Sequence, residues 1–459
     1  MMKDKLETLT ILQLRELAKH EGLKKFTALN KHDLVSLLVE HYEAKVDAEE
    51  ESIEAPKALH KEETLSHSAK KQQSDEKIPM EMRELDSGII AHGILEVMPD
   101  GFGFIRCENF LPGDNDVYVA PSQIKRFKLK TGDIISGSRR VKASAEKFAA
   151  LLYVQTVNGY RVSELEHRPN FEDLTPIFPD KRIPLANFPH SPTSMRVMDI
   201  ISPIGKGQRG MIVSPPKAGK TTLLKEVAKA VLKNEPDMNI IILLIDERPE
   251  EVTDIKEAIT GEQVIYSTFD ELPERHKRVS EMVIERAKRL VEHGKDVIIL
   301  LDSITRLARA YNLTIASSGR TLSGGLDTAA LHMPKRFFGA ARNTREGGSL
   351  TILATALVDT GSRMDDIVYE EFKGTGNMEL VLDRKLSEKR IFPSIDILKS
   401  GTRRDDLLLS SAEQEALRII KKSTNSNKAE ESAERVISLF ADTRNNKEFV
   451  EHIIKRQTV

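Results

Sequence analysis

Apolar residues recur at helical spacing in the first part of the chain and then disappear. Leucines fall mostly three positions apart in two groups within residues 3–43, with a break that begins near Gly22. This pattern predicts a small helical domain over residues 1–43. Residues 44–87 are rich in Glu, Lys, Ser and Gln and nearly free of aromatics. A segment of that composition cannot bury a core, so we predict a flexible charged linker there.

Between residues 93 and 157 the apolar pattern changes from helical to alternating. Five short runs punctuated by glycine occupy residues 93–98, 101–106, 116–120, 132–137 and 149–154. Such runs are typical of a small five-stranded barrel of the oligonucleotide-binding type, which we predict over residues 88–163. The following stretch is rich in proline and is expected to form a connector over residues 164–196.

From residue 197 to residue 459 the patterns of strands and helices alternate, which predicts an α/β domain built on a mostly parallel sheet. Two continuous apolar runs, 237–246 and 296–302, are typical of strands covered on both faces, and each ends in acidic residues. The carboxyl ends of parallel strands open onto the ligand crevice. We therefore expect Glu247 and Asp302 to lie at one edge of the sheet.

A phosphate-binding loop is predicted between the strand that starts at Met211 and the helix that follows. Its sequence is Ser-Pro-Pro-Lys-Ala-Gly-Lys-Thr over residues 214–221, with Ser214 where the usual pattern has glycine. In such a loop backbone N–H groups point at the phosphates, Lys220 reaches the β- and γ-oxygens, and the Thr221 hydroxyl binds Mg²⁺. Asp302 is then placed to hold Mg²⁺ through water and Glu247 to polarise an attacking water. The predicted chemistry is hydrolysis of a nucleoside triphosphate.

Composition excludes several other classes of site and protein. Lys and Arg number 69 against 71 Asp and Glu, a formal net charge of -2, so any nucleic-acid site must be a local patch. The single cysteine, Cys107, excludes a disulfide framework and a Cys-rich zinc site. No apolar run reaches the roughly 18–20 residues of a membrane span. We expect a soluble, cytoplasmic protein without a membrane partner.

One local patch is predicted in the barrel. Phe102 and Phe104 are two positions apart in Asp-Gly-Phe-Gly-Phe-Ile-Arg, so their rings face the same side of a strand and the glycines leave them bare. Bases stack on such rings while nearby Arg and Lys hold phosphates. Residues 123–147 carry eight Lys or Arg and two acids, a local balance of +6. The barrel is therefore predicted to bind single-stranded nucleic acid, with RNA and DNA both open at this point.

The barrel, the phosphate loop and Leu-Ile-Asp-Glu-Arg-Pro-Glu-Glu-Val-Thr over residues 244–253 together resemble the Rho family of bacterial transcription termination factors. Long family signatures also match residues 205–210, 300–312, 334–343 and 372–379. The resemblance implies a multidomain α/β protein with an N-terminal helical domain, an OB/cold-shock-like barrel and a RecA-like ATPase domain. It further implies a homohexameric ring that uses ATP with Mg²⁺, and no other cofactor, to move 5′ to 3′ on nascent RNA and to release it from RNA polymerase.

The resemblance also assigns residues to the ATP site. Those matching nucleotide contacts are Gly205, Lys206, Gly207, Gln208, Arg209, Gly210, Lys217, Ala218, Gly219, Lys220, Thr221, Thr222 and Arg248, with Phe392 stacking on the adenine. Glu247 matches the catalytic base and Asp302 the acid on the Mg²⁺ side. Arg403 matches the arginine finger that completes a neighbouring subunit's site.

Two RNA-binding sets follow from the same resemblance. The primary site, which favours pyrimidines, matches Phe102, Phe104, Arg106, Tyr118, Glu146, Lys147 and Phe148. Two central-pore loops match Arg320, Ser323, Gly325 and Arg363. Phe148 stands where family members usually have Tyr, so a hydroxyl contact is lost while stacking is kept. Arg320 and Arg363 stand where Lys is frequent, and Arg binds phosphate bidentately, so stepping speed is the property most affected.

Two other functions compete with this interpretation. A catalytic subunit of a rotary ATP synthase would share the RecA-like core, but its N-terminal barrel would lack the Phe-Gly-Phe strand and the basic run. A non-enzymatic RNA chaperone would use the barrel alone, which the intact set of Lys220, Thr221, Glu247, Asp302 and Arg403 argues against.

Overall fold

The computed structural model describes residue 31 and residues 85–457, with gaps at 143–145, 163–167, 189, 261–262 and 425–428. Apart from residue 31, the predicted helical domain, residues 1–43, lies outside these residues, as does nearly all of the predicted linker, residues 44–87. From residue 85 onward the described chain belongs to one compact unit, Lys77–Val459. No described helix is both long and apolar enough to cross a membrane.

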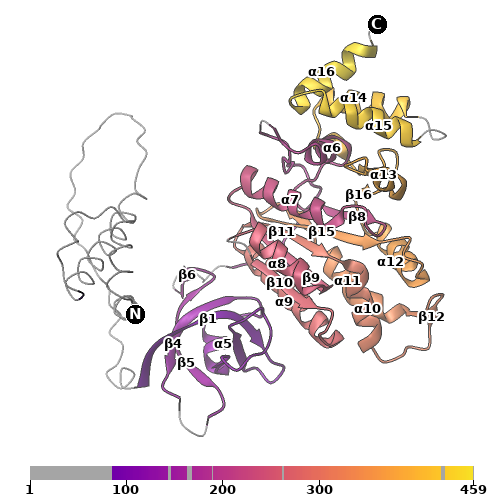
Figure 1. Cartoon of the computed structure of the whole chain (residues 1–459). Coiled ribbons are helices and arrows are strands. Elements are labelled where there is room, and N and C mark those ends of the chain that lie inside the picture. The colour runs from indigo at the N-terminus through magenta and orange to yellow at the C-terminus, as the bar shows by residue number, and fades with distance from the viewer. Residues whose placement is uncertain are drawn as a thin grey trace, which may run out of the picture. The chain divides into compact units, whose positions relative to one another are not determined.

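The first part of this unit is a closed small barrel (Figure 1). Its sheet has the order β3-β2-β1-β4-β5-β6 and is closed by a parallel pairing of β3 with β5. The prediction of a five-stranded barrel is confirmed, with the two-residue β6 as an addition. The bounds are β1 (Asp86–Val97), β2 (Gly103–Arg106), β3 (Val117–Val119), α5 (Pro121–Arg126), β4 (Ile134–Arg140), β5 (Ala149–Val157) and β6 (Tyr160–Arg161).

The alternating pattern decides which side chains fill the barrel. Leu95, Ile105, Val117 and Ile135 have no exposed surface and form its core. Because successive side chains of a strand point to opposite faces, the neighbours of Ile105 in β2, Phe104 and Arg106, lie on the outer face. The barrel core thereby fixes the side on which the predicted RNA contacts sit.

The second part is an α/β domain with a nine-stranded sheet, whose main path runs β10-β9-β11-β15-β8-β16-β17. Neighbouring strands from β10 to β16 are parallel, and only the short β17, β14 and β7 pair antiparallel. The prediction of a mostly parallel sheet is confirmed. The bounds are β7 (Pro176–Ile177), β8 (Arg209–Ser214), β9 (Asn239–Glu247), β10 (Gln263–Thr268), β11 (Asp296–Asp302), β14 (Arg342–Thr344), β15 (Ser349–Leu357), β16 (Met378–Val381) and β17 (Gly401–Thr402).

Helices cover both faces of this sheet, which explains why its strands are continuously apolar. In β9, Ile240 and Ile242 pack with α7 and α8, while Ile241 and Leu243 pack with α9 and α10. The helices are α6 (Thr193–Ile201), α7 (Lys220–Asn234), α8 (Pro249–Ala258), α9 (Pro273–Glu292), α10 (Ile304–Thr314), α11 (His332–Gly339), α12 (Arg363–Lys373), α13 (Arg384–Glu388), α14 (Ser411–Ser423), α15 (Ala429–Ala441) and α16 (Asn446–Gln457).

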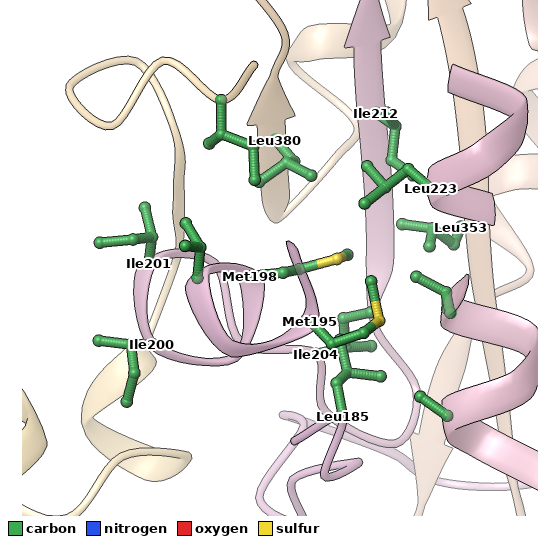
Figure 2. Close-up of a cluster of buried hydrophobic side chains, with 14 of the residues drawn as sticks. Leu185, Met195, Met198, Ile200, Ile201, Ile204, Ile212, Leu223, Leu353 and Leu380 are labelled. Carbon is green, nitrogen blue, oxygen red and sulfur yellow. The ribbon is translucent and has the colours of Figure 1, made fainter. Parts of the chain in front are cut away.

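Helix α6 closes one end of the larger core. Figure 2 shows Met198 extending from α6 toward the side of the sheet that carries Ile212 of β8, near Leu223 of α7. All three side chains are buried. Burying one such side chain is worth about 1.5–3 kcal/mol, so this cluster anchors β8 and α7, the two elements that flank the predicted phosphate loop.

The barrel packs on α9 of the ATPase domain through close backbone contact and buried charge. Gly132 has φ +95°, and a Cβ there would lie 2.4 Å from the backbone carbon of Glu285. Glu292, at the end of α9, accepts ion pairs from Lys130 of the barrel and from Arg168 of the connector, each at 3.2 Å. Only glycine permits this approach. A second contact joins the barrel to β10, where Asn109 exchanges two hydrogen bonds with the backbone of Tyr266.

Candidate functional site

The phosphate loop lies between β8 and α7. Lys217 and Gly219 adopt left-handed backbone conformations, with φ +63° and +91°, and Gly219 caps the helix that begins at Lys220. The first N–H groups of a helix have no partners within it and carry partial positive charge, which makes this end of α7 an anion site. Ser214, which replaces the usual glycine, is buried at the end of β8, and its hydroxyl donates to the Pro215 carbonyl at 2.9 Å.

Lys220 is held by the two acids that the sequence placed at the sheet edge. Its Nζ lies 2.5 Å from Asp302 Oδ1 and 3.1 Å from Glu247 Oε1. Asp302 is 1% exposed and also accepts a hydrogen bond from the Thr355 hydroxyl at 2.8 Å. Burial by itself would lower the pKa of Lys220, but the charges of Asp302 and Glu247 outweigh burial and raise it. The lysine is therefore a fixed positive charge at the loop.

Glu247 combines burial with a cationic neighbour. It ends β9 and is 4% exposed, and this burial raises the pKa of its carboxyl group, although Lys220 opposes the shift. Asp302 ends β11, the strand beside β9, which brings the two acids together. A raised pKa makes a carboxylate a stronger base, so Glu247 is better suited to accept a proton from water than an exposed glutamate.

Two contacts around these acids were not predicted from the sequence. Arg306 donates to Asp246 at 2.6 Å and has its Nε 3.9 Å from Glu247, and Thr355 binds Asp302 as described. Arg306 lies four residues after Asp302, so one turn of α10 returns its side chain to the site. This spacing is the feature of the sequence that could have predicted the contact. Thr355 comes from β15, and no motif indicates it.

The oxygen groups at the loop suit a magnesium ion carried by a nucleotide. Thr221 lies at the start of α7 with its hydroxyl 3.4 Å from Glu251 Oε2, and the buried Asp302 supplies a carboxylate. Mg²⁺ prefers such hard oxygen ligands and usually takes its remaining ligands from phosphates and water. Among the described residues no group of three or more His, Cys, Asp or Glu could hold a metal. The Thr221 hydroxyl and the Asp302 carboxylate are oxygen groups of the kind that Mg²⁺ prefers.

Phe392 also reaches the phosphate loop. Its ring is 56% exposed, and a methyl group placed on Gly219 would contact it at 3.8 Å. The Ser394 hydroxyl donates to the Ala218 carbonyl at 2.9 Å and ties the two segments together. Arg248 follows Glu247 directly and is exposed at the start of α8. An exposed ring beside the loop is available to stack on a base.

The segment Gly205–Gly210 is not brought to the phosphate loop within the chain. It begins before β8, so much of the six-residue strand, about 20 Å long, separates it from Ser214. At that opposite edge Lys206 forms ion pairs with Asp296 at 2.8 Å and Glu235 at 2.9 Å. Gly207 packs closely in this segment, because its φ is +89° and a Cβ there would lie 2.1 Å from the Asn343 nitrogen.

We expect Gly207→Ala to destabilise the ATPase domain by at least about 1–3 kcal/mol, because an alanine would be strained at that φ and would also clash with Asn343. Gly294→Ala is the matched control, since Gly294 has φ +71° but no atom within 4 Å of its Cβ position. Urea unfolding of both variants measures the difference. Equal losses of stability would show that the contact with Asn343 is unimportant.

Arg403 lies at the edge of the sheet away from Lys220. It follows β17, whose Thr402 pairs with Met378, the first residue of β16. Because β16 runs parallel to β8, the start of β16 and the end of β8 lie at opposite edges. Arg403 is exposed, and within the described part of the chain its side chain has no ion pair or hydrogen bond. It is free to act on something other than its own phosphate loop.

The two predicted pore loops contact each other and α10. Arg320, Ser323 and Gly325 are exposed between α10 and α11, and a Cβ on the adjoining Gly324 would lie 3.3 Å from Arg363 Cβ. Arg309 of α10 forms an ion pair with Asp365 at 2.6 Å, two residues beyond Arg363. Helix α10 begins two residues after Asp302. The structure therefore brings both loops together on a helix that starts at the acids.

Four aromatic rings form a half-exposed cluster on the outer face of the barrel. The Phe104 centroid lies 5.8 Å from Phe102, 6.0 Å from Tyr118 and 5.2 Å from Phe148. Phe104 and Tyr118 are direct partners in the β2–β3 register, which places them on one face. A half-exposed cluster of rings outside a filled core is suited to stacking bases.

The charged residues predicted for this face differ in accessibility. Lys147 is exposed, with its Nζ 5.2 Å from the centre of the Phe148 ring, and Glu146 forms an ion pair with Arg140. Arg106 is only 5% exposed, and its guanidinium lies 4.8 Å from the centre of the Phe104 ring. In this arrangement Arg106 supports the ring from below and does not reach out to a phosphate.

We expect Phe104→Ala and Tyr118→Ala each to weaken binding of a cytidine oligonucleotide by about 1–3 kcal/mol, the usual value of one lost stack. A change of Lys125 to Gln should mainly reduce the salt dependence of binding, because this residue is exposed and a lysine that neutralises phosphate contributes through release of counterions. Filter binding over a range of salt concentrations measures both effects. Unfolding of the barrel in the alanine variants, seen by circular dichroism, would instead assign the rings to the core.

Comparison with known proteins matches two separate parts of the chain to two families. The family described as Rho termination factor, RNA-binding domain, matches residues 91–163. The family described as ATP synthase alpha/beta family, nucleotide-binding domain, matches residues 194–402. A solved ATPase from the type III secretion system of pathogenic bacteria aligns with a TM-score of 0.53 and 22% identity, over 69% of this chain and 94% of its own. At this identity the likeness shows the fold alone.

Curated relatives match almost the whole chain. The transcription termination factor Rho of Bacillus subtilis (strain 168) is 48% identical over 445 residues, which cover 97% of this chain and 94% of the relative. That of Thermotoga maritima is 46% identical over 454 residues, 98% of this chain and 96% of the relative. That of Pseudomonas aeruginosa is 54% identical over 372 residues, 80% and 88% respectively. At this identity and coverage, the chain belongs to the Rho family of transcription termination factors.

Proposed function

We propose that this protein is an ATP-driven motor that binds nascent single-stranded RNA, moves along it 5′ to 3′ as a homohexameric ring, and terminates transcription by releasing the RNA from RNA polymerase. One observation carries the proposal. A phosphate loop whose lysine contacts two buried acids lies in the same compact unit as a barrel with an exposed row of aromatic rings. Hydrolysis and RNA binding are the two activities that such a motor must join.

In the proposed reaction Lys220 and the N–H groups at the start of α7 hold the phosphates of ATP, and Phe392 stacks on the adenine. Entry of the γ-phosphate gives Lys220 a new anionic partner in addition to Asp302 and Glu247. When bound, Mg²⁺ neutralises charge on the phosphates, and the Thr221 hydroxyl and Asp302 are the groups that would hold it, the latter through water. Glu247 orients a water in line with the γ-phosphoryl group and accepts its proton.

Assembly of several subunits would supply the arginine that the ATP site of a single chain lacks. The phosphate loop and Arg403 occupy opposite edges of the same sheet, so Arg403 cannot complete its own site. A ring of like subunits places the Arg403 edge of one chain against the phosphate-loop edge of the next. The guanidinium would then neutralise charge on the transferring phosphoryl group, the role of an arginine finger.

RNA is proposed to bind at two places. The ring cluster of the barrel takes pyrimidine-rich RNA, for which Phe102, Phe104 and Tyr118 supply stacking surfaces. Arg320 and Arg363 of the touching pore loops contact the phosphates of the strand that passes through the ring. Helix α10 contacts the first loop through Asn312, which donates to the Gly325 carbonyl, and the second through Arg309, which pairs with Asp365. Because α10 starts beside Asp302, a change at the ATP site has a direct route to the pore.

Steady-state phosphate release with poly(C), with poly(A) and without RNA tests the proposal. A motor of this kind hydrolyses ATP fastest with poly(C). The match to the ATP synthase nucleotide-binding family favours a rotary ATPase subunit as the second candidate, and that protein would hydrolyse ATP at the same rate with or without RNA. No hydrolysis under any condition would point to an RNA chaperone.

Lys220→Ala should abolish hydrolysis and leave oligo(C) binding by the barrel intact, because Lys220 contacts only the acids of the ATPase domain. Lys225→Ala is a suitable control, since Lys225 lies on the same helix but pairs with the half-exposed Asp254. Phosphate release and oligonucleotide binding are measured on the same preparations. Joint loss of both activities in a folded Lys220→Ala protein would contradict the division of labour between the domains.

A further inference from the structure

The aromatic face of the barrel is connected to helix α9 of the ATPase domain by shared charge, and we propose that Arg278 of α9 is a positioning residue for RNA bound on that face. This inference rests on the proposed function, because it takes the ring cluster as the RNA site. It adds to that function a residue of the ATPase domain that acts on RNA binding through the barrel.

Arg106 is the first member of the connection. Its guanidinium lies under Phe104 and donates to Glu96 from Nε at 2.7 Å and from a terminal nitrogen at 2.6 Å, and to Asp116 at 2.5 Å. Glu96 is the direct partner of Phe104 in the β1–β2 register, so both side chains lie on the same face. These contacts with the Glu96 and Asp116 carboxylates restrict the Arg106 side chain to few conformations. The guanidinium is thereby held in place under the Phe104 ring.

Arg278 is the second member, and it comes from the other domain. One of its terminal nitrogens lies 2.7 Å from Oε2 of Glu96, the same oxygen that binds Arg106. The Nε of Arg278 is buried without a hydrogen-bond partner, so the described structure orients this guanidinium mainly through Glu96. The Glu96 carboxylate, held by both Arg106 and Arg278, has fewer accessible rotamers than it would have if Arg106 alone held it. Glu96 in turn holds Arg106, and thereby the support of Phe104, in one position.

The far side of the connection leads toward Glu247, the proposed catalytic base. Helix α9 starts at Pro273, shortly after β10, and the Phe269 amide donates to the Glu247 carbonyl at 3.1 Å. A base stacked on Phe104 fixes Arg106 and Glu96, and thereby favours the Glu96–Arg278 contact. By linkage the same contact favours the bound base. Arg278 therefore lowers the RNA concentration that is needed to activate hydrolysis.

The experiment uses the full chain with Arg278→Gln, which keeps the polarity and most of the length of the side chain and removes its charge. We expect the oligo(C) concentration for half-maximal ATPase activation to rise about two- to fivefold, the usual range for a partly exposed ion pair. The rate at saturating RNA and the KM for ATP should stay unchanged. Arg278→Lys keeps the charge, so its oligo(C) concentration for half-maximal activation should stay close to that of the unchanged protein.

Arg275→Gln is the matched control, since Arg275 lies three residues earlier on α9 and pairs only with Glu271 within its own domain. It should leave RNA activation unchanged. Glu96→Gln combined with Arg278→Gln should give less than the product of the two single effects, because both changes remove the same contact.

Two outcomes would overturn the inference separately from the proposed function. If Phe104→Ala weakens oligo(C) binding while Arg278→Gln changes nothing, the RNA face is real and Arg278 does not position it. If Arg278→Gln lowers the maximal rate or raises the KM for ATP without moving RNA activation, the contact only supports the ATPase domain. If Phe104→Ala itself leaves binding unchanged, the RNA face is wrong and the inference falls with it.

Discussion

Rings built from Arg403→Ala subunits are expected to bind ATP and RNA normally and to hydrolyse ATP about 10³–10⁵-fold more slowly, the range associated with an arginine finger. The reason is positional. Arg403 follows β17 at the edge of the sheet away from Lys220, is exposed, and has no side-chain partner in the described chain. Its removal should therefore leave the fold of its own subunit unaffected and deprive only the next subunit's site.

Mixing Arg403→Ala with Lys220→Ala protein distinguishes action in trans from action in cis. A mixed interface can join the intact phosphate loop of one variant to the intact Arg403 of the other, so the ATPase rate should pass through a maximum as the ratio changes. Each pure variant should be nearly inactive. A rate that never exceeds the pure variants, although mixed rings form, would contradict the assignment.

Arg404→Ala is the matched control for this experiment. Arg404 is the next residue, but its guanidinium is held by Asp406 at 3.0 Å and lies 5.4 Å from the centre of the Phe178 ring. The Arg404→Ala variant should therefore retain near-normal hydrolysis. A large loss in Arg404→Ala together with a normal rate in Arg403→Ala would transfer the finger role to Arg404.

Glu247→Gln is expected to keep ATP binding and to lower turnover by about 10²–10⁴-fold, the usual contribution of a general base. The amide keeps the shape of the side chain and can still hydrogen-bond, but it cannot accept a proton from water. Lys220 retains Asp302 as its partner at 2.5 Å, so the phosphate loop should keep its geometry. Equilibrium binding of a labelled nucleotide and single-turnover hydrolysis separate the two effects.

The pH dependence of turnover gives a second measurement on the same residue. Burial raises the pKa of Glu247, so the base becomes protonated, and hydrolysis slows, at a higher pH than for an exposed glutamate as the pH falls. The Gln variant should lack this dependence. Asp246→Asn serves as the control, because Asp246 adjoins Glu247 but pairs with Arg306 at 2.6 Å. Near-normal turnover in Glu247→Gln with loss in Asp246→Asn would assign the base to Asp246.

The sequence by itself determined the domain types and the principal chemistry. Alternating runs such as that around Ile105 are typical of a half-buried strand, and a continuous run such as residues 237–246 is typical of a strand covered on both faces. Because parallel strands end at one edge, the positions of Glu247 and Asp302 after two such runs were enough to place both acids beside Lys220. These rules depend on residues that are close together in the sequence, so they can be applied without knowing how distant segments pack.

Only the tertiary structure decided the environment of each group. Arg106 was expected among the RNA contacts, but Glu96 and Asp116 bury it beneath Phe104, because cross-strand register sets its neighbours. The Gly205–Gly210 segment matches a family signature, yet it lies at the edge of the sheet opposite the phosphate loop. The Arg278–Glu96 contact joins residues 182 positions apart. Spacing along a chain cannot indicate such pairs, because they depend on how one domain packs against another.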